Sequence, residues 1–156
     1  MTAIKLTVLT ALTILGMVLM AGVVSAQDVS QAQSRITMDD IDSALQKGPV
    51  FLEFETKECS YCRQQKPITE SLESEYSGNV TFFYIDAAEN RDIARKFQVS
   101  GVPQMNVIVS KTDGGYTYAG RDGRTSENLG ETKFVGLTQG DVLKSALDAA
   151  VQMRGT

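Results

Sequence analysis

Hydrophobic positions along this chain change their spacing from one segment to the next, and the spacing predicts a mixture of helices and strands. From Thr37 onward, apolar side chains recur at helical intervals until Gly48 and Pro49 interrupt the pattern. Residues 50–54 then form a short, almost continuous apolar run, which is typical of a strand covered on both faces. We therefore expect a helix followed by a buried strand.

The same two patterns repeat after this strand. Residues 63–76 place apolar side chains four apart, with Pro67 among them, which predicts an amphipathic helix with a kink. Residues 80–85 predict a second strand and residues 90–97 a short helix. Because a strand, a crossover helix and a second strand form a parallel pair, the segment after the first strand is expected at the sheet edge where open α/β folds place their sites.

The remainder of the chain predicts two more strands and a closing helix. Residues 105–109 and 131–137 have the composition of strands, and an amphipathic helix is expected from Thr138 onward. Residues 111–130, between these two strands, are rich in glycine and polar side chains. They predict a long loop or a hairpin extension.

The first part of the chain indicates export. Lys5 is followed by a largely apolar stretch over residues 6–24, and small side chains precede Gln27, which suits cleavage by a signal peptidase. Residues 1–26 are thus predicted to be a signal peptide. The apolar stretch is also about long enough to span a bilayer, so an uncleaved membrane anchor through it stays an alternative.

Composition and charge limit the classes of partner expected for the residues after the predicted signal peptide. Residues 27–36 are polar and aperiodic, which predicts a tether, and residues 37–156 then form one domain, expected to be monomeric. The chain carries 15 Lys and Arg against 19 Asp and Glu, a net charge of −4, so no nucleic-acid partner is expected. The predicted location is periplasmic or extracellular, with anchoring to the outer face of the cytoplasmic membrane as the alternative.

Cys59 and Cys62 are the only two cysteines, and they stand between the first predicted strand and the next helix. Two intervening residues let the sulfurs meet across one helical turn, and a thiol at a helix N-terminus is acidified by the unpaired amides. Zinc needs about four ligands, and the sequence holds no histidine. We therefore expect no metal and no cofactor other than a redox-active disulfide, although a static disulfide stays open.

Several further motifs stand at fixed distances from the cysteine pair. Phe54 precedes it, Pro67 follows it within the predicted helix, Asp86 closes the second predicted strand, and a Gly-Val-Pro triplet at 101–103 precedes the third. Together these motifs resemble the thioredoxin superfamily over residues 37–153. The resemblance implies an α/β, thioredoxin-like fold with a central mixed sheet of about four to five strands flanked by helices.

The resemblance also implies a reaction and its catalytic residues. In an extracytoplasmic thiol–disulfide oxidoreductase, Cys59 would attack a substrate disulfide as the thiolate and Cys62 would resolve the mixed disulfide. Run backwards, the same steps oxidise a dithiol. Glu53 stands six residues before Cys59, where thioredoxins place a buried acid that assists proton transfer at the second cysteine.

The implied substrate-binding residues flank the cysteines. Pro103 is expected to be cis and to pack beside the disulfide, while Val102 offers its backbone to an incoming polypeptide as if adding a strand. Ser60 and Tyr61, between the cysteines, complete the expected surface. The expected partners are protein thiols or disulfides and an unidentified electron donor or acceptor.

Departures from the thioredoxin pattern keep two alternatives open. Thioredoxins carry a tryptophan directly before the first cysteine, and this chain has none. A tyrosine directly before the second cysteine, as at Tyr61, resembles the glutaredoxin pattern, so a glutathione-dependent oxidoreductase is the first alternative. The second is a non-catalytic binding module with a structural disulfide, in which Tyr116, Tyr118 and Arg121 of the 111–130 extension grip a protein partner.

Overall fold

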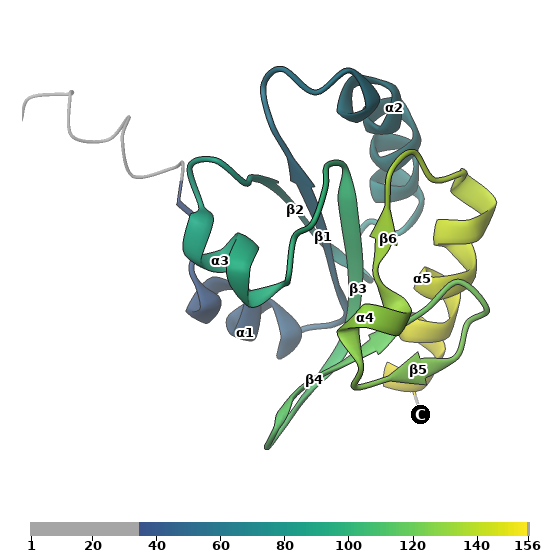
Figure 1. Cartoon of the computed structure of the whole chain (residues 1–156). Helices are drawn as coiled ribbons and strands as arrows, with labels where there is room; N and C mark the ends of the chain where they lie inside the picture. Colours follow the sequence, from purple (N-terminus) through teal and green to yellow (C-terminus); the bar gives the residue numbers. More distant parts are fainter. Residues whose placement is uncertain (1–34, 156) are drawn as a thin grey trace, which may run out of the picture. The chain divides into compact units, whose positions relative to one another are not determined.

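The computed structural model describes residues 35–155, and Figure 1 shows how their helices and strands are arranged. The predicted signal peptide, and all but the end of the predicted tether, lie outside these residues. None of the helices between residues 35 and 155 has the length and apolar character needed to cross a membrane. The helices are α1 (Met38–Leu45), α2 (Ser60–Glu75), α3 (Arg91–Lys96), α4 (Leu129–Thr132) and α5 (Gly140–Arg154), and the strands are β1 (Val50–Glu55), β2 (Thr81–Asp86), β3 (Gln104–Thr112), β4 (Gly115–Ala119), β5 (Thr125–Ser126) and β6 (Phe134–Val135).

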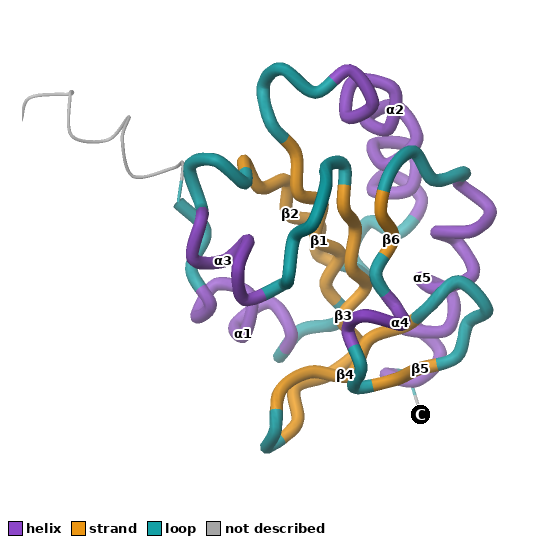
Figure 2. The backbone as a smooth tube through the Cα atoms, in the orientation of Figure 1, coloured by secondary structure: helices purple, strands orange, loops and turns teal. Residues whose placement is uncertain are grey.

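The strands of the described residues form one mixed sheet in the order β2-β1-β3-β4-β5, with β6 also paired to β3 (Figure 2). β1 and β2 are parallel, whereas β3 is antiparallel to β1, β4 and β6. The mixed sheet is confirmed, and it has six strands rather than four or five because β5 and β6 are two-residue additions. The parallel pair places the start of α2 at the carboxyl end of β1.

Helices cover both faces of the sheet because β1 is apolar on both of its faces. Leu52 and Phe54 pack with apolar residues of α1 and α3 in one buried cluster. Phe51 belongs to a second cluster, which contains Leu72 of α2 and four residues of α5. The sheet thus lies between α1 and α3 on one side and α2 and α5 on the other, as the alternation of side chains along a strand requires.

The first two helices, α1 and α2, each begin directly after an N-cap residue. Thr37 and Asp40 form the expected capping box at the start of α1. α2 begins at Ser60, one turn earlier than the predicted start at Arg63, because Cys59 is its N-cap and accepts a hydrogen bond from the amide of Cys62. The cysteine pair therefore belongs to the first turn of α2 rather than to a preceding loop.

Residues 111–130, predicted as a long loop or a hairpin extension, begin as a hairpin. β3 continues to Thr112 and β4 returns beside it, so the front of the extension is a hairpin in the sheet. Tyr116 and Tyr118 are buried there, at 6% and 7% exposure, and the Tyr116 hydroxyl donates to Asp42 of α1 at 2.6 Å. These two tyrosines are therefore core residues, and the alternative in which they grip a protein partner is wrong for both of them.

The predicted fourth strand over residues 131–137 is also shorter than expected. Asn128 caps α4 by accepting a hydrogen bond from Gly130, so the helix takes up the segment through Thr132. Only Phe134 and Val135 remain extended, and they pair with the first two residues of β3. β6 thereby covers the part of the β3 edge that β4 does not reach.

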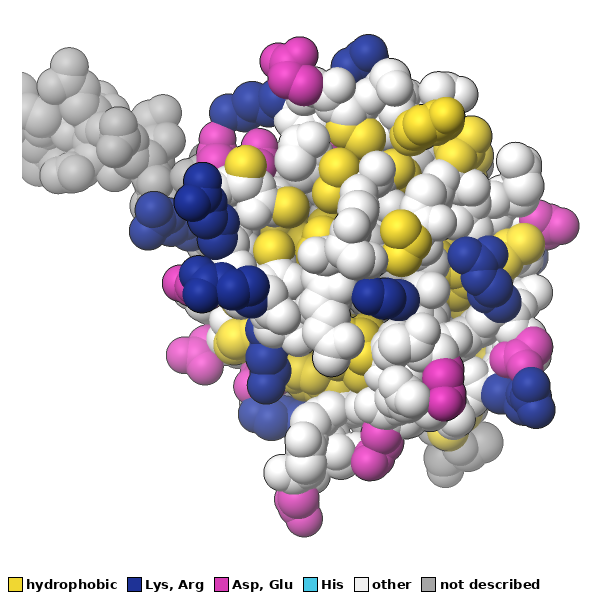
Figure 3. Space-filling view, in the orientation of Figure 1, with side chains coloured by type: hydrophobic (Ala, Val, Ile, Leu, Met, Phe, Trp, Pro, Cys, Tyr) yellow, Lys and Arg dark blue, Asp and Glu magenta, His cyan; other side chains and the backbone are white. Residues whose placement is uncertain are grey.

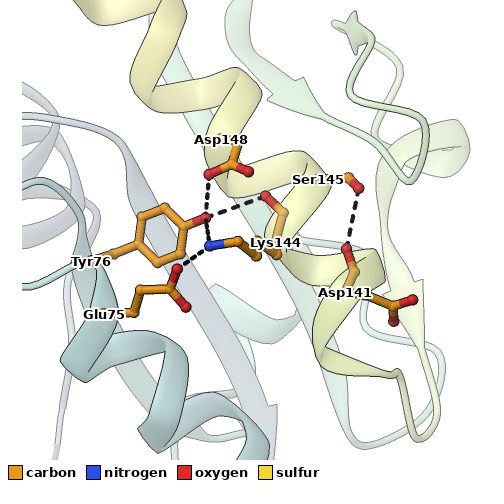
Figure 4. Close-up of polar contacts among 6 residues, drawn as sticks. All are labelled: Glu75, Tyr76, Asp141, Lys144, Ser145 and Asp148. Carbon is orange, nitrogen blue, oxygen red and sulfur yellow. Dashed lines mark hydrogen bonds and ion pairs between the residues drawn. The ribbon is translucent and has the colours of Figure 1, made fainter.

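A polar cluster joins the C-terminal end of α2 to α5, as Figure 4 shows. The Tyr76 hydroxyl donates to the carboxylate of Asp148, and Lys144 forms an ion pair with Glu75. The Lys144 ammonium also lies 5.2 Å from the centre of the Tyr76 ring. Burial, with the Asp148 carboxylate as a further cause, raises the pKa of Tyr76 to about 12, so its hydroxyl keeps its proton and remains a donor.

Candidate functional site

The two cysteines form a disulfide at the start of α2. Their Cα atoms are 5.2 Å apart, and the amide of Cys62 donates to Cys59 Sγ at 3.0 Å. Cys62 is buried at 3% exposure, whereas Cys59 is partly exposed and the intervening Tyr61 is 59% exposed. Cys59 is thus the sulfur that a second molecule can reach, and the helix N-terminus would stabilise its thiolate after reduction.

The loop over residues 97–103, here called the cis-proline loop, faces this disulfide from the opposite side of the site. The Val102–Pro103 peptide bond is cis, as the resemblance implied. The carbonyl oxygen of Val102 lies 3.6 Å from Cys59 Sγ. Cys59, Val102 and Pro103 are therefore brought together, while Ser60 and Tyr61 remain exposed beside them.

Gln104, which the sequence reasoning did not single out, holds the cis-proline loop from below. Its side chain is fully buried, donates to the carbonyl oxygen of Phe97 at 3.0 Å and accepts from the amide of Ser100 at 3.3 Å. One side-chain amide thus forms hydrogen bonds with two backbone groups of the loop, three residues apart. On the outer side, the Lys133 ammonium donates to the carbonyl of Gln98 at 3.0 Å.

A second buried glutamine, Gln65 of α2, fixes the turn between β6 and α5. Its amide group donates to the carbonyl of Thr138 at 3.2 Å and accepts from the Thr138 amide at 2.8 Å. In the same turn, the amide of Gly136 donates to the carbonyl of Pro103 at 2.8 Å. These bonds join the turn both to the helix that carries the cysteines and to the cis-proline loop.

Glu53 lies in the middle of β1, is fully buried, and has no hydrogen-bond partner for either carboxylate oxygen among the described residues. Loss of hydration on burial raises the pKa of Glu53 to about 7. Thr69 on the facing helix acts in the opposite direction, but its hydroxyl donates to the carbonyl of Lys66 at 3.0 Å. Glu53 can therefore take up or release a proton near neutral pH.

Exposed apolar side chains gather around the disulfide. Among the described residues, the large exposed hydrophobic side chains are Tyr61, Val135, Leu137 and Met153, and the first three belong to the start of α2 and the β6 turn. Val135 pairs with Gln104, directly after the cis-proline. This surface can contact an extended polypeptide whose sulfur approaches Cys59.

One charged side chain beside the cysteines is already paired. Lys57, two residues before Cys59, forms an ion pair with Glu89 at 2.6 Å, so its charge is already balanced. No group of three or more histidine, cysteine or acidic side chains within residues 35–155 is placed to hold a metal ion. The groups that this part of the chain brings together are the two sulfurs and the backbone of the cis-proline loop, with the Glu53 carboxyl buried in β1.

Comparison with protein-family models matches residues 32–132 of the chain to the thioredoxin family. A relative with curated function is the protein disulfide-isomerase tigA of Aspergillus niger, which is 32% identical over 122 residues. The match covers 72% of this chain and 33% of that protein, so the chain spans about a third of its length. A thioredoxin of Staphylococcus epidermidis is 29% identical over 74 residues, covering 47% of this chain and 71% of that one.

Solved structures show the same fold at lower identity. A mutant thioredoxin of Halobacterium salinarum has a TM-score of 0.55 and 23% identity, covering 75% of this chain and 88% of that one. Oxidised mitochondrial thioredoxin 3 of Saccharomyces cerevisiae has a TM-score of 0.54 and 20% identity, covering 74% and 93%. At these identities the likeness shows the fold alone.

Proposed function

Because the chain belongs to the thioredoxin family, we propose that it is an extracytoplasmic thiol–disulfide oxidoreductase acting on protein thiols or disulfides. The observation that carries this proposal is the Cys59–Cys62 disulfide at a helix N-terminus, with the Val102 carbonyl 3.6 Å from Cys59 Sγ. Cys59 attacks a substrate disulfide as the thiolate, and Cys62 then displaces the substrate thiol. Glu53 exchanges the proton of Cys62 in this second step.

A redox titration of the full-length protein in thiol/disulfide buffers, read by alkylation of both cysteines, tests the reaction and its direction. A midpoint near that of thioredoxin, about −270 mV, supports a reductant that needs an electron donor; one near −120 mV supports a disulfide donor that needs an acceptor. A pair that stays oxidised in every buffer, and a protein that exchanges with no disulfide, would contradict the proposal in favour of a structural bridge.

Export rests on the apolar residues 6–24 followed by small side chains. Fractionation of cells that express the chain with a C-terminal tag tests it. Tagged protein outside the cytoplasm and shortened by about 26 residues supports a cleaved signal peptide, and full-length protein in the membrane fraction supports the anchor. Tagged protein in the cytoplasm contradicts both.

A further inference from the structure

A shallow depression lies between α3 and the cis-proline loop, with a volume of about 440 Å³. Ala87, Ala94 and Val99 line it with apolar atoms, and the guanidinium side chains of Arg91 and Arg95 stand at its rim. The two arginines are four residues apart on α3, so they project from the same side of the helix. Figure 3 shows dark-blue side chains over α3 beside a strip of hydrophobic ones.

The depression adjoins the reactive disulfide through two backbone segments. The amide of Ala87 donates to the carbonyl of Glu55 at 2.9 Å, at the end of β1 and four residues before Cys59. Val99 stands three residues before Val102, whose carbonyl faces Cys59 Sγ. A polypeptide bound along the cis-proline loop with its sulfur at Cys59 therefore reaches the depression within a few residues.

The arginines at the rim carry charge that is weakly balanced. Arg91 forms no ion pair within residues 35–155, and its Nε donates only to a backbone carbonyl at 3.3 Å. Glu89 nearby is already paired with Lys57. Arg95 pairs with Asp92 at 2.8 Å, but both side chains are largely exposed, and such pairs contribute little. The Arg91 guanidinium is therefore available to bind a carboxylate of another molecule. This holds even though the net charge of the whole chain is negative.

We propose that this depression binds an acidic side chain of the polypeptide substrate, within a few residues of the cysteine that reacts with Cys59. The methylene groups of a glutamate pack on the apolar floor, and its carboxylate accepts hydrogen bonds from Arg91 and Arg95. Guanidinium groups match carboxylate geometry in this way. This inference rests on the proposed function and names the substrate class of that site.

The test uses pairs of peptides that each carry one cysteine as a mixed disulfide with thionitrobenzoate. In each pair, glutamate or glutamine occupies one of the three positions on either side of the cysteine. Cys59 of the reduced full-length protein attacks the peptide sulfur and thionitrobenzoate leaves with the electron pair. Cys62 then attacks Cys59, which releases the peptide as a thiol and leaves the protein as the disulfide. The release of coloured thionitrobenzoate gives the rate.

We expect a glutamate peptide at one position to react about five-fold faster than its glutamine partner at low salt, the size of one solvent-exposed charge interaction. High salt should remove the preference, the Arg91→Ala/Arg95→Ala double variant should lose it, and Arg91→Glu should reverse it. Arg124→Ala, on the turn before β5, is the matched control and should keep it. A preference that survives in the double variant, or no preference at any position, overturns the inference.

Two small-molecule disulfides distinguish failure of this inference from failure of the proposed oxidoreductase function. Hydroxyethyl disulfide is neutral, so a protein that reacts with it but shows no charge preference contradicts this inference alone. A protein that reacts with no disulfide contradicts the proposed function as well. If the double variant slows oxidised glutathione as strongly as the glutamate peptide, the depression serves a small carboxylate-bearing disulfide, and the assignment to a polypeptide is wrong.

Discussion

The two ends of helix α2 treat their polar groups in opposite ways. At its start, Cys59 Sγ faces a carbonyl oxygen and Glu53 lies beneath the helix with no hydrogen-bond partner among the described residues. At its end, Tyr76 and Glu75 are bound to Asp148 and Lys144 of α5 (Figure 4). The polar groups near the start of this 16-residue helix thus have few hydrogen-bond partners, whereas those at its end form hydrogen bonds and an ion pair with α5.

This difference indicates how the fold remains stable although the residues around Cys59 contribute little to its folding free energy. A buried carboxyl without partners lowers stability once it ionises, and the apolar side chains exposed around Cys59 add little to the core. The cluster at the other end of α2, together with the Gln65 bonds to Thr138, holds the helix in place. Changes at the start of α2 should therefore affect chemistry, and changes at its end should affect stability.

The largest effect should come from Cys59→Ser at the reactive end. A hydroxyl is a far weaker nucleophile than a thiolate, so release of thionitrobenzoate from a peptide disulfide should fall below detection. Cys62→Ser should instead accumulate a mixed disulfide with the substrate, visible by mass spectrometry. Asp148→Asn at the other end is the control and should react at the wild-type rate. Equal rates for Cys59→Ser and wild type would remove the functional contrast between the two ends.

Glu53→Gln should change how stability depends on pH. With its pKa raised from 4.5 to about 7, folded Glu53 holds a proton that the unfolded chain has lost between these values. The free energy of unfolding of the wild type should therefore fall as pH rises through this window, by up to about 3 kcal/mol. The variant should lack this fall and be the more stable protein at pH 8. Urea unfolding of both oxidised proteins from pH 4 to 8 measures it, and parallel curves would contradict the raised pKa.

The same variant sharpens the contrast in kinetics. If Glu53 exchanges the proton of Cys62, Glu53→Gln should slow the resolution of the mixed disulfide, while the first attack by Cys59 stays unchanged. Stopped-flow mixing with a peptide disulfide separates the two steps. A slower first step with normal resolution would place the carboxyl's influence on Cys59 instead.

Tyr76→Phe at the other end should cost about 1 kcal/mol of unfolding free energy, the usual net contribution of one hydrogen bond. The disulfide exchange rate should not change, because the substitution lies at the far end of α2. Urea unfolding at pH 7 gives the first quantity and thionitrobenzoate release the second. A variant as stable as wild type would mean that the Asp148 contact contributes nothing to holding α5.

The smallest effect is expected for Lys144→Gln, which removes the exposed ion pair with Glu75. Its stability loss should be smaller than that of Tyr76→Phe and should shrink further as salt is added, since surface ion pairs are screened. Thermal melts at low and high salt measure this. A loss that is independent of salt would point to the contact with the Tyr76 ring rather than to charge.

Periodicity predicted most of the fold, and it failed where local signals conflicted. The strands β1, β2 and β3 and the helices α1, α2, α3 and α5 all stand near their predicted positions. The glycines and polar residues of the 111–130 segment left a loop and a hairpin equally open, although Asp113 and Gly114 before the alternating Tyr116 and Tyr118 are a hairpin signal. The short α4 could not be read from periodicity, because four residues do not define a period.

The candidate site was predicted in its sulfurs and its cis-proline, but not in its supports. Gln65 follows Cys62 at helical spacing, so a stripe counted from Cys62 would have marked it as inward-facing. No such signal exists for its bonds to Thr138, which is 73 residues away along the chain. Gln104 likewise carries no local sign that it holds the two halves of the cis-proline loop.

The sequence by itself determined the types of the main elements, the spacing of the two cysteines and the acid six residues before them, because these depend on residues near each other in the chain. The tertiary structure alone decided that Val102 faces Cys59 across 43 residues, that Tyr116 and Tyr118 are buried, and that Glu53 has no hydrogen-bond partner among residues 35–155. Burial and long-range hydrogen bonds depend on which elements pack together. They set the pKa of Glu53 and the shape of the surface around the disulfide, neither of which is encoded in any single segment.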